Sequence, residues 1–297
     1  MSQTMDVVLL FSGCGGMDLG FIGDFEFLGK FYSRTHFRII WANEVNRSAC
    51  QTYRNNISRD IIVGDIWDHI NRLPTSADVV IGGFPCQDIS INGKGAGIAG
   101  SRSSLYRAMV ETVKRVQPKI FVAENVKGLL MKHNASSLLQ ILTDFSTLGY
   151  HVSYQLYNAA DYGVPQTRER VIIVGTRQDM PTFIPPIPVS SRHITAKEAI
   201  ADLEHLPSNP DNNHIWSLAN KSADQGNRKL KADRAGYTIR AECHGNIQFH
   251  YHLNRRISMR EAARIQSFPD SFIFDAKLRE MERQIGNAVP PGYSDRS

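Results

Sequence analysis

Short apolar runs alternate with longer amphipathic stretches through the first part of this chain. The runs are rich in Val, Ile and Phe, which is typical of buried strands, and the stretches between them repeat their apolar positions with helical spacing. The runs predict strands at 7–11, 37–42, 61–63, 78–81, 120–123 and 170–175, with helices from about 47 and over 105–116 and 136–148. This alternation predicts a doubly wound α/β sheet with helices on both faces.

The pattern changes after Gly175. Four prolines at 181, 185, 186 and 188 interrupt regular structure, and the next stretch is polar and without periodicity. Residues 221–256 contain eight Lys or Arg against three Asp or Glu. Helical periodicity resumes at about Ser258. We therefore expect a main domain that begins with 1–178, a smaller basic domain at 179–256, and a return to the main domain at 257–297.

Composition narrows the possible classes of protein. The chain is 42% hydrophobic and 21% charged, as is ordinary for a globular protein. No apolar run approaches the ~20 residues of a membrane span, and the N-terminus lacks the basic flank of a signal peptide. For these two reasons we expect a cytoplasmic protein. We also expect a monomer, because nothing in the sequence indicates a self-complementary apolar patch.

Charge and cysteine content restrict the possible functions only weakly. Four cysteines without CxxC spacing indicate neither a zinc site nor a disulfide framework, so no metal is expected. A net charge of +5 is compatible with a polyanionic partner, although many proteins that never bind nucleic acid are equally basic.

The most informative chemical feature is a cysteine at the end of a predicted buried strand. The sequence Gly82-Gly83-Phe84-Pro85-Cys86-Gln87 follows the strand at 78–81. Ligands of open α/β sheets bind at the carboxyl ends of the strands, and a thiolate there is a nucleophile. A lone cysteine is more often an inert buried residue, so the neighbouring residues must decide.

Three other predicted strands also end in residues suited to ligand binding. A glycine-rich turn at 11–16 follows the first strand, Glu44 the second and Asp65 the third. Glu44 is placed to bind a ribose diol and Asp65 an exocyclic amine, although a solvated loop residue or a helix cap is the usual role of a single acid. The turn is not G-x-G-x-x-G and no phosphate-binding lysine follows, which disfavours nicotinamide and P-loop proteins.

Further motifs follow in a fixed order and complete the pattern. After the turn, Glu44, Asp65 and Pro85-Cys86-Gln87 come Glu124-Asn125-Val126, Gln166-Thr167-Arg168-Glu169-Arg170, Arg260-Glu261-Ala262-Ala263-Arg264, Gln266-Ser267-Phe268-Pro269 and Gly286-Asn287-Ala288-Val289-Pro290-Pro291. Together they resemble, over nearly the whole chain, the DNA (cytosine-5) methyltransferase family of prokaryotic type II restriction–modification systems. The resemblance implies a Rossmann-like S-adenosylmethionine-dependent methyltransferase sheet, with 179–256 as target recognition domain.

The resemblance also assigns catalytic roles. Carbon 5 of cytosine is too electron-poor to attack a methyl donor, but addition of the Cys86 thiolate at carbon 6 makes it nucleophilic. Glu124 is implied to bind ring nitrogen 3 and Arg170 the ring carbonyl. Arg168, in the same motif, is included in the catalytic set, and we expect it to act there as a structural partner of Arg170.

The implied cofactor is S-adenosylmethionine, and the implied partner is duplex DNA. The cofactor-binding set is Phe11, Ser12, Gly13, Gly15, Gly16, Glu44, Val45, Asp65, Ile66, Pro85, Asn287 and Val289. Trp41 lines the adenine pocket or belongs to the core. The set expected to bind DNA is Gln87, Ser90, Arg102, Arg228, Lys229 and Arg240. For the basic residues a solvated surface is the competing interpretation.

Several functional expectations follow from the resemblance. The enzyme methylates one cytosine in a short duplex sequence, after flipping it out of the helix. The glycine-rich stretch 90–103 either closes over that base or is an ordinary loop. A cognate restriction endonuclease is the expected independent partner.

Two alternatives stay open, which are methylation of tRNA and a DNA-binding relative without catalysis. The second arises because the polar tail at 292–297 stands where the family continues into an apolar helix. Its absence is expected to weaken stability or cofactor affinity.

Overall fold

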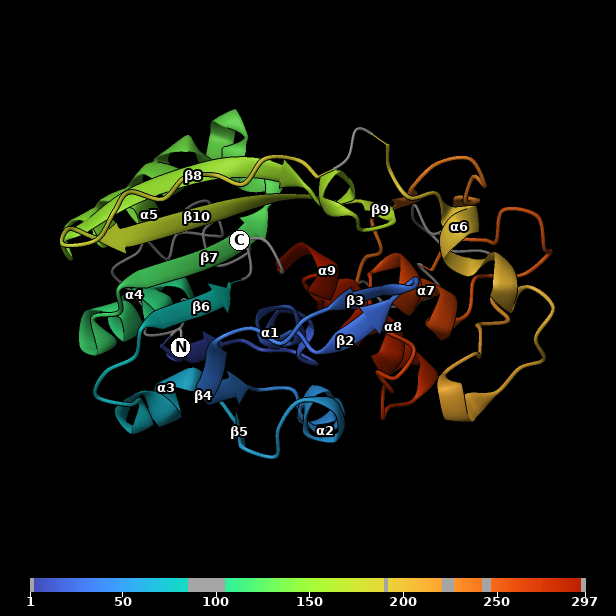
Figure 1. The fold of residues 1–297 in the computed structure, drawn as a ribbon, viewed down its shortest axis with the longest axis horizontal. Helices are drawn as coiled ribbons and strands as arrows, with labels where there is room; N and C mark the ends of the chain where they lie inside the picture. The colour runs from blue at the N-terminus through green and yellow to red at the C-terminus, as the bar shows by residue number, and fades with distance from the viewer. Residues whose placement is uncertain (1–2, 85–104, 190–191, 221–226, 242–246, 295–297) are drawn as a thin grey trace.

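A seven-stranded sheet lies at the centre of the protein (Figure 1). The computed structural model describes residues 3–84, 105–189, 192–220, 227–241 and 247–294. In spatial order the strands are β5 (Ile61–Val63), β4 (Phe37–Glu44), β1 (Met5–Leu10), β6 (Val79–Gly83), β7 (Ile120–Val126), β10 (Glu169–Arg177) and β8 (Tyr150–Asn158). The strands from β5 to β7 pair in parallel, whereas β10 is antiparallel to both of its neighbours.

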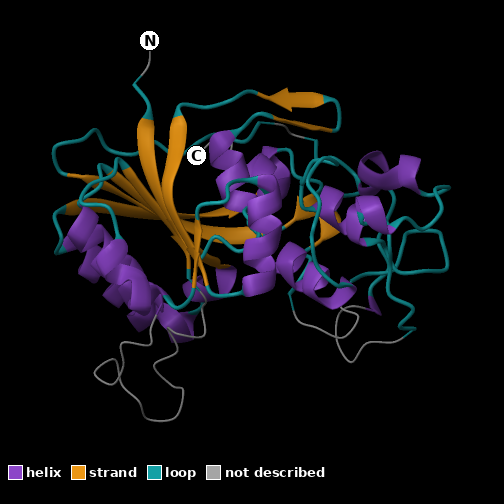
Figure 2. Cartoon of the chain, turned by 90° about the horizontal axis from the view of Figure 1, so that it is seen from below, coloured by secondary structure: helices purple, strands orange, loops and turns teal. Residues whose placement is uncertain are grey.

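Helices pack on both faces of this sheet, as Figure 2 also shows, which confirms the predicted doubly wound α/β fold. Along β1, Val8 and Leu10 face one core while Val7 and Leu9 face another, because successive side chains of a strand point to opposite sides. The first core holds α3 (Ile66–His69), α4 (Leu105–Val116) and α5 (Ala135–Ser146). The opposite face is covered by α1 (Gly16–Ile22) and α2 (Arg47–Asn56).

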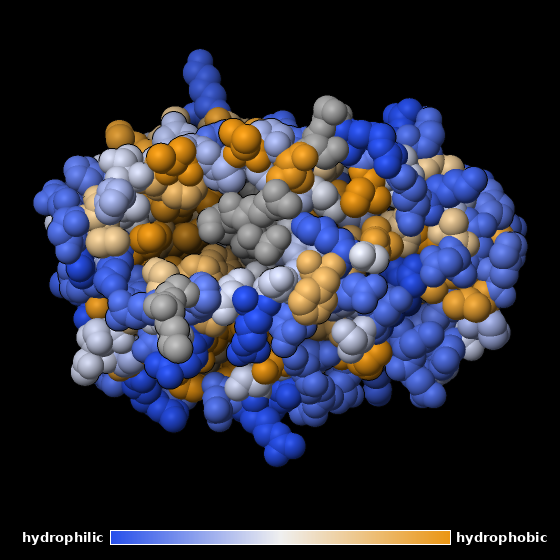
Figure 3. Space-filling model, in the orientation of Figure 1, coloured by the Kyte–Doolittle hydropathy of each residue, from blue (hydrophilic) through white to orange (hydrophobic). Residues whose placement is uncertain are grey.

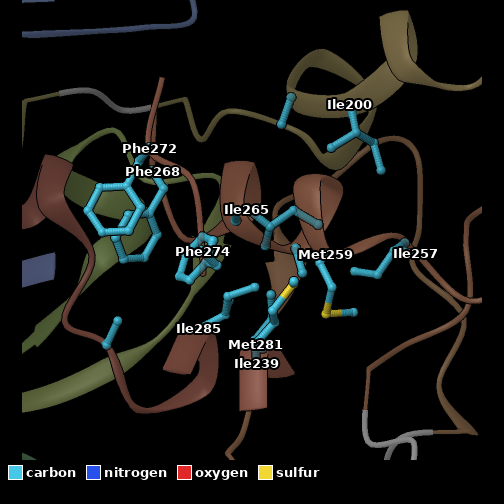
Figure 4. Close-up of a cluster of buried hydrophobic side chains, with 14 of the residues drawn as sticks. Ile200, Ile239, Ile257, Met259, Ile265, Phe268, Phe272, Phe274, Met281 and Ile285 are labelled. Atoms are coloured by element: carbon cyan, nitrogen blue, oxygen red, sulfur yellow. The ribbon is translucent and has the colours of Figure 1, made fainter. Parts of the chain in front are cut away.

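A separate apolar cluster connects distant parts of the chain (Figure 4). It is built around α6 (Ala196–Ile200), α7 (Met259–Ile265) and α8 (Leu278–Asn287). The hairpin of β2 (Phe25–Phe27) and β3 (Lys30–Tyr32) packs into the same cluster. Burial of these side chains therefore joins the N-terminal and C-terminal parts of the sequence.

The remaining elements are short. A parallel pair joins β9 (Gln166–Thr167) to β11 (Gly236–Tyr237), and α9 (Pro291–Ser294) follows the last long helix. Single 3₁₀ turns cover Ile70–Arg72, Lys127–Leu130, Lys132–Asn134, Ala159–Tyr162, Ala201–Leu203 and Pro210–Asn212. In the space-filling view, hydrophobic residues gather over the sheet, and the end that holds α6 and α7 is more hydrophilic (Figure 3). None of the helices in the described residues is long and apolar enough to span a bilayer.

Three features of the fold differ from the sequence prediction. β8 was not predicted, because as an edge strand it has only two fully buried residues and no continuous apolar run. The β2–β3 hairpin was missed because its two-residue turn is Leu28-Gly29, with φ of 47° and 74°; such turns usually carry Asn or Gly in the first position. β6 does not stop before its glycine pair, since Gly82 and Gly83 continue the ladder with β7.

The close packing of β10 against the core provides a test of this fold. A Cβ added at Gly175 would overlap the ring of Phe121, which stacks on Phe145 at 4.2 Å between centroids. We expect Gly175→Ala to lower the free energy of unfolding by about 2 kcal/mol or more through overpacking. Gly128→Ala is the matched control, because its Cβ would have no neighbour closer than 3.7 Å. Equal melting temperatures of the two variants would contradict the packing described.

Candidate active site

The site is formed where the parallel strands end. Leu10 of β1 pairs with Asn43 of β4 on one side and with Gly82 of β6 on the other. Gly83 pairs in turn with Glu124 of β7. Because parallel strands carry their carboxyl ends at one edge, the residues that follow β1, β4, β5, β6 and β7 are brought together there.

The turn after β1 has a backbone that few residues adopt. Phe11 has a φ of 60°, and Gly13 and Gly15 have φ of 57° and 98°. Left-handed backbone at a bulky residue such as Phe11 costs on the order of 1 kcal/mol and is found mainly at functional sites. A Cβ at Gly13 would meet no atom within 4 Å, so its backbone faces open space.

The last motif returns to this turn. A Cβ at Gly16, the first residue of α1, would overlap the carbonyl oxygen of Val289. The Val289 side chain packs on the apolar cluster of β1, β6 and α1, while Asn287 is exposed at the end of α8. The chain therefore brings the first and last motifs side by side.

Glu44 is fixed by two backbone donors. Its carboxylate accepts hydrogen bonds from the N–H of Gly13 at 2.9 Å and the N–H of Asn46 at 2.7 Å. Asn46 in turn caps α2 through the N–H groups of Ser48 and Ala49. The carboxylate is thus held between the glycine turn and the start of a helix.

The other residues predicted to contact the adenosine have different environments. Asp65 is exposed and caps α3, with its Oδ1 accepting the N–H of Trp67 at 2.9 Å. Val45 is 66% exposed beside Glu44. Ile66 and Trp41 are buried in the core on the α4 face of the sheet, so Trp41 is a core residue.

An ion pair lies at the carboxyl end of β7. Arg170 Nε is 2.7 Å from Glu124 Oε1, and both side chains are largely buried. The antiparallel direction of β10 places its first residues beside the last residues of β7, with Arg170 opposite Val126. A Cβ at Gly83 would lie 3.1 Å from Glu124 Oε2, so the glycine gives the carboxylate room.

A buried asparagine connects β7 to the strand before the cysteine. Asn125 is 1% exposed and donates from Nδ2 to the Phe84 carbonyl at 3.0 Å. Its Oδ1 accepts the N–H of Val126 at 2.8 Å. Of the predicted site, Pro85, Cys86, Gln87, Ser90 and Arg102 lie outside the described residues.

Arg168 is 2% exposed, and its guanidinium donates to backbone carbonyls. The acceptors are Ile239 O at 3.0 Å, Gly286 O at 3.1 Å and Ala288 O at 3.0 Å. Burial, with a smaller contribution from the charge of Arg170, lowers the pKa of Arg168 to about 9. These contacts are structural: they tie β9 and β10 to the region before residue 240 and to the last motif.

Gln166, in the same motif as Arg168, is fully buried and was assigned no role from the sequence. Its amide donates to Gln266 Oε1 at 2.6 Å and its oxygen accepts the N–H of Ile239 at 2.9 Å. Gln266 donates on to the Ala288 carbonyl at 3.2 Å. The regular spacing of glutamine and arginine in the 166–170 motif was the available signal.

Three basic residues predicted to contact DNA, Arg228, Lys229 and Arg240, lie in the described residues and are exposed. Arg228 lies with its guanidinium carbon 5.3 Å from the ring centroid of Tyr237. Lys229 and Arg240 are exposed on the same part of the chain. The backbone at Arg240 touches Gly286 at the end of α8, which places this surface beside the last motif.

One cluster of possible metal ligands lies in the described residues away from this edge. Ligand atoms of Glu204, His250 and His252 lie within 4.8 Å of one another. However, His250 Nδ1 accepts the N–H groups of His252 and Leu253, which leaves the ring proton on Nε2. Nε2 faces Glu204 at 3.8 Å, so the ring offers a proton rather than a lone pair and suits a metal ion poorly.

The sequence profile of the C-5 cytosine-specific DNA methylase family matches residues 5–247 and 219–295 of this chain. The chain belongs to that family. This methylase is 37% identical to Type II methyltransferase M.NgoFVII of Neisseria gonorrhoeae, over 98% of its own length and 84% of that protein. It is 35% identical to Type II methyltransferase M.FnuDI of Fusobacterium nucleatum, over 96% of this chain and 91% of that one.

Solved structures show the same fold. A protein described as a DNA modification methyltransferase encoded within an E. coli prophage superposes with a TM-score of 0.70 at 22% identity, over 98% of this chain and 96% of that one. The Dnmt2 methyltransferase of S. pombe gives 0.65 at 16% identity, over 97% and 95% of the two chains. The chain is a DNA cytosine-5 methyltransferase, and its sheet is the Rossmann-like sheet of such enzymes.

A buried acid near the glycine turn makes the stability of this methylase depend on pH. Asp18 in α1 is fully buried and accepts the hydroxyl hydrogen of Tyr53 at 2.8 Å. Burial raises its pKa from 3.8 to about 7. Below about pH 4 the group is protonated in both the folded and unfolded states, so it carries no cost.

As pH rises toward 7, only the unfolded state releases this proton, and the free energy of unfolding falls by up to about 4 kcal/mol. Asp18→Asn has no proton to release in this pH range and so lacks this pH dependence. We expect its melting temperature to decline less between pH 4.5 and 7.5 than that of the unmodified protein. Asp68→Asn, an exposed change in α3, is the control. Parallel melting-temperature profiles for Asp18→Asn and the unmodified protein would contradict this assignment.

Proposed function

We propose that this enzyme methylates carbon 5 of one cytosine in a specific short duplex DNA sequence, through a covalent bond between Cys86 and the base. The observation that carries the proposal is the Glu124–Arg170 ion pair, which lies one strand away from the end of β6 that leads to Cys86. A largely buried carboxyl group and a guanidinium side by side match two neighbouring atoms of cytosine, ring nitrogen 3 and the carbonyl oxygen. The relatives named as type II methyltransferases support a DNA substrate.

The residues after β1, β4 and β5 fit S-adenosylmethionine. The open space at Gly13 admits a ligand close to the backbone, and the fixed Glu44 carboxylate beside it suits a ribose diol. Asp65, exposed at the next strand end, suits the adenine amine. When bound, S-adenosylmethionine supplies an electrophilic methyl group.

The chain's own residues account for activation of the base. The Cys86 sulfur adds to carbon 6, which forms a C–S bond and moves an electron pair toward carbon 5. Glu124, as the carboxylic acid, donates its proton to ring nitrogen 3, and the Arg170 guanidinium donates to the carbonyl oxygen, so the negative charge that develops on the ring is stabilised. After carbon 5 is methylated, a base takes its proton, the C–S bond breaks and the Cys86 thiolate leaves.

Access to the base and choice of sequence require the rest of the chain. A cytosine stacked in a duplex is not accessible to this site, so the target nucleotide flips out at a cost of a few kcal/mol. We assign recognition to the 179–256 domain, with Arg228, Lys229 and Arg240 binding phosphates. Methylation of every copy of one sequence would protect cytoplasmic DNA from a cognate restriction endonuclease that acts independently.

Transfer of labelled methyl groups from S-adenosylmethionine tests the proposal. We expect 5-methylcytosine in unmethylated duplex DNA, and a rate at least about 10³-fold lower for Cys86→Ala, because loss of a nucleophile removes the covalent route. Cys86→Ala should keep its melting temperature and its affinity for S-adenosylmethionine. Bisulfite sequencing of the product would give the target sequence.

The same assay separates the alternatives. Label in tRNA and none in DNA would replace the DNA substrate by RNA. A folded protein that binds DNA but transfers no label would be a non-catalytic relative. Once the target is known, a duplex with 5-fluorocytosine at that position should remain bound in SDS, because fluorine replaces the proton that must leave.

A further inference from the structure

Asn43 occupies a central position among the strand ends of the proposed cofactor site. It directly precedes Glu44 in β4 and is 1% exposed. Its side-chain amide donates to two carbonyls, Ile62 O in β5 at 3.1 Å and Gly64 O directly after β5 at 3.0 Å. Its own carbonyl accepts the N–H of Ser12, in the glycine turn, at 3.0 Å.

These bonds connect three segments that carry predicted cofactor ligands. Ser12 belongs to the turn after β1, Asn43 is next to Glu44, and Gly64 is next to Asp65. A further bond, from Gly64 N–H to the Glu44 carbonyl at 3.0 Å, completes the connection between β4 and β5. Glu44 is therefore the neighbour of Asn43 itself, and Asp65 is the neighbour of Gly64, whose carbonyl Asn43 binds.

The backbone at Gly64 explains why such an anchor is needed. Its φ is 144°, a conformation that residues with a side chain rarely adopt, and a Cβ there would lie 2.6 Å from His69 Nε2. A glycine has more conformational freedom than any other residue. The two hydrogen bonds from the Asn43 amide restrict the carbonyls on either side of Val63 and so fix the direction in which the chain enters Asp65.

We infer that Asn43 is a positioning residue for the methyl donor, setting the separation of Glu44 from Asp65 without contacting the donor itself. The inference rests on the proposed binding of S-adenosylmethionine at these two carboxylates. Loss of the Asn43 amide leaves two backbone carbonyls without a hydrogen-bond donor and frees the Gly64-Asp65 backbone. We therefore expect binding of S-adenosylmethionine to weaken more than DNA binding or the rate of methyl transfer.

The test measures KM for S-adenosylmethionine, KM for DNA and kcat, with donor affinity by calorimetry. For Asn43→Ala we expect KM and Kd for S-adenosylmethionine to rise about tenfold, while KM for DNA and kcat at saturating donor stay close to the unmodified values. Asn43→Ser keeps one donor and should give an intermediate KM. It also serves if the alanine variant fails to fold.

Asn56→Ala is the matched control. The Asn56 amide also donates to two carbonyls, Thr52 O at 2.7 Å and Ile273 O at 2.8 Å, at the far end of α2. This variant should lose melting temperature without a change in KM for S-adenosylmethionine. A purely structural role for Asn43 would give the same result as Asn56→Ala and overturn the inference.

The result for the unmodified protein distinguishes a failure of the positioning role of Asn43 from a failure of the proposed function. If it binds S-adenosylmethionine and both folded Asn43 variants bind it equally well, only the positioning role is wrong. If the unmodified protein binds no S-adenosylmethionine, the proposed function fails and this inference fails with it.

Discussion

The antiparallel pairing of β10 with β7 is the constraint on which the catalytic half of the site depends. A parallel strand in that position would bring its last residues to the functional edge, but β10 brings its first. Arg170 therefore meets Glu124, 46 positions earlier in the sequence, at 2.7 Å. Both side chains are largely buried, so neither charge could be kept there without the other.

The two halves of the site lie on either side of the point where the strand order reverses. β1, β4 and β5 follow one another outward in one direction, and β6 and β7 in the other. Ligands of open α/β sheets bind at such a switch point. Here the carboxylates suited to the methyl donor fall on the first side and the ion pair suited to the base on the second, so two molecules can meet at one edge.

Arg168 and Gln166 show how the rest of the chain is held to that edge. Their side chains reach backbone groups near residue 239 and in the last motif, which are far away in sequence. Arg168 donates to backbone carbonyls, whereas the Gln166 oxygen accepts the backbone N–H of Ile239. Removal of either buried side chain leaves these backbone groups unsatisfied. The 166–170 motif thus carries one residue of the proposed base-binding pair, Arg170, and two that hold the surrounding segments.

Much of this arrangement could be predicted from the sequence, for physical reasons that differ between elements. Strands buried on both faces, such as β1 and β6, need continuous apolar runs and are visible for that reason. β8 has only two fully buried residues, at 150 and 157, and carries no such signal. The hairpin at 25–32 could not be predicted, because Leu28 occupies a turn position that usually carries Asn or Gly.

The same contrast holds for the site. The placement of Glu44 and Asp65 at strand ends could be predicted from the apolar runs before them, whereas Glu124 was identified through the resemblance of its motif to the family. Asn43 and Asn125 could not be given a role, since their partners are backbone carbonyls on other strands, and a sequence does not show which carbonyls a side chain will reach. Trp41 likewise belongs to a core whose members come from many separate elements, and a sequence does not show which of them will cover it.

A double-mutant cycle on the rate of methyl transfer, with Glu124→Gln, Arg170→Lys and the combined variant, tests whether Glu124 and Arg170 act on the base as one unit. For joint action we expect the double variant to be about as slow as the slower single variant, because either change disables the pair. Losses that multiply, so that the double variant is slower by the product of the two single effects, would contradict it.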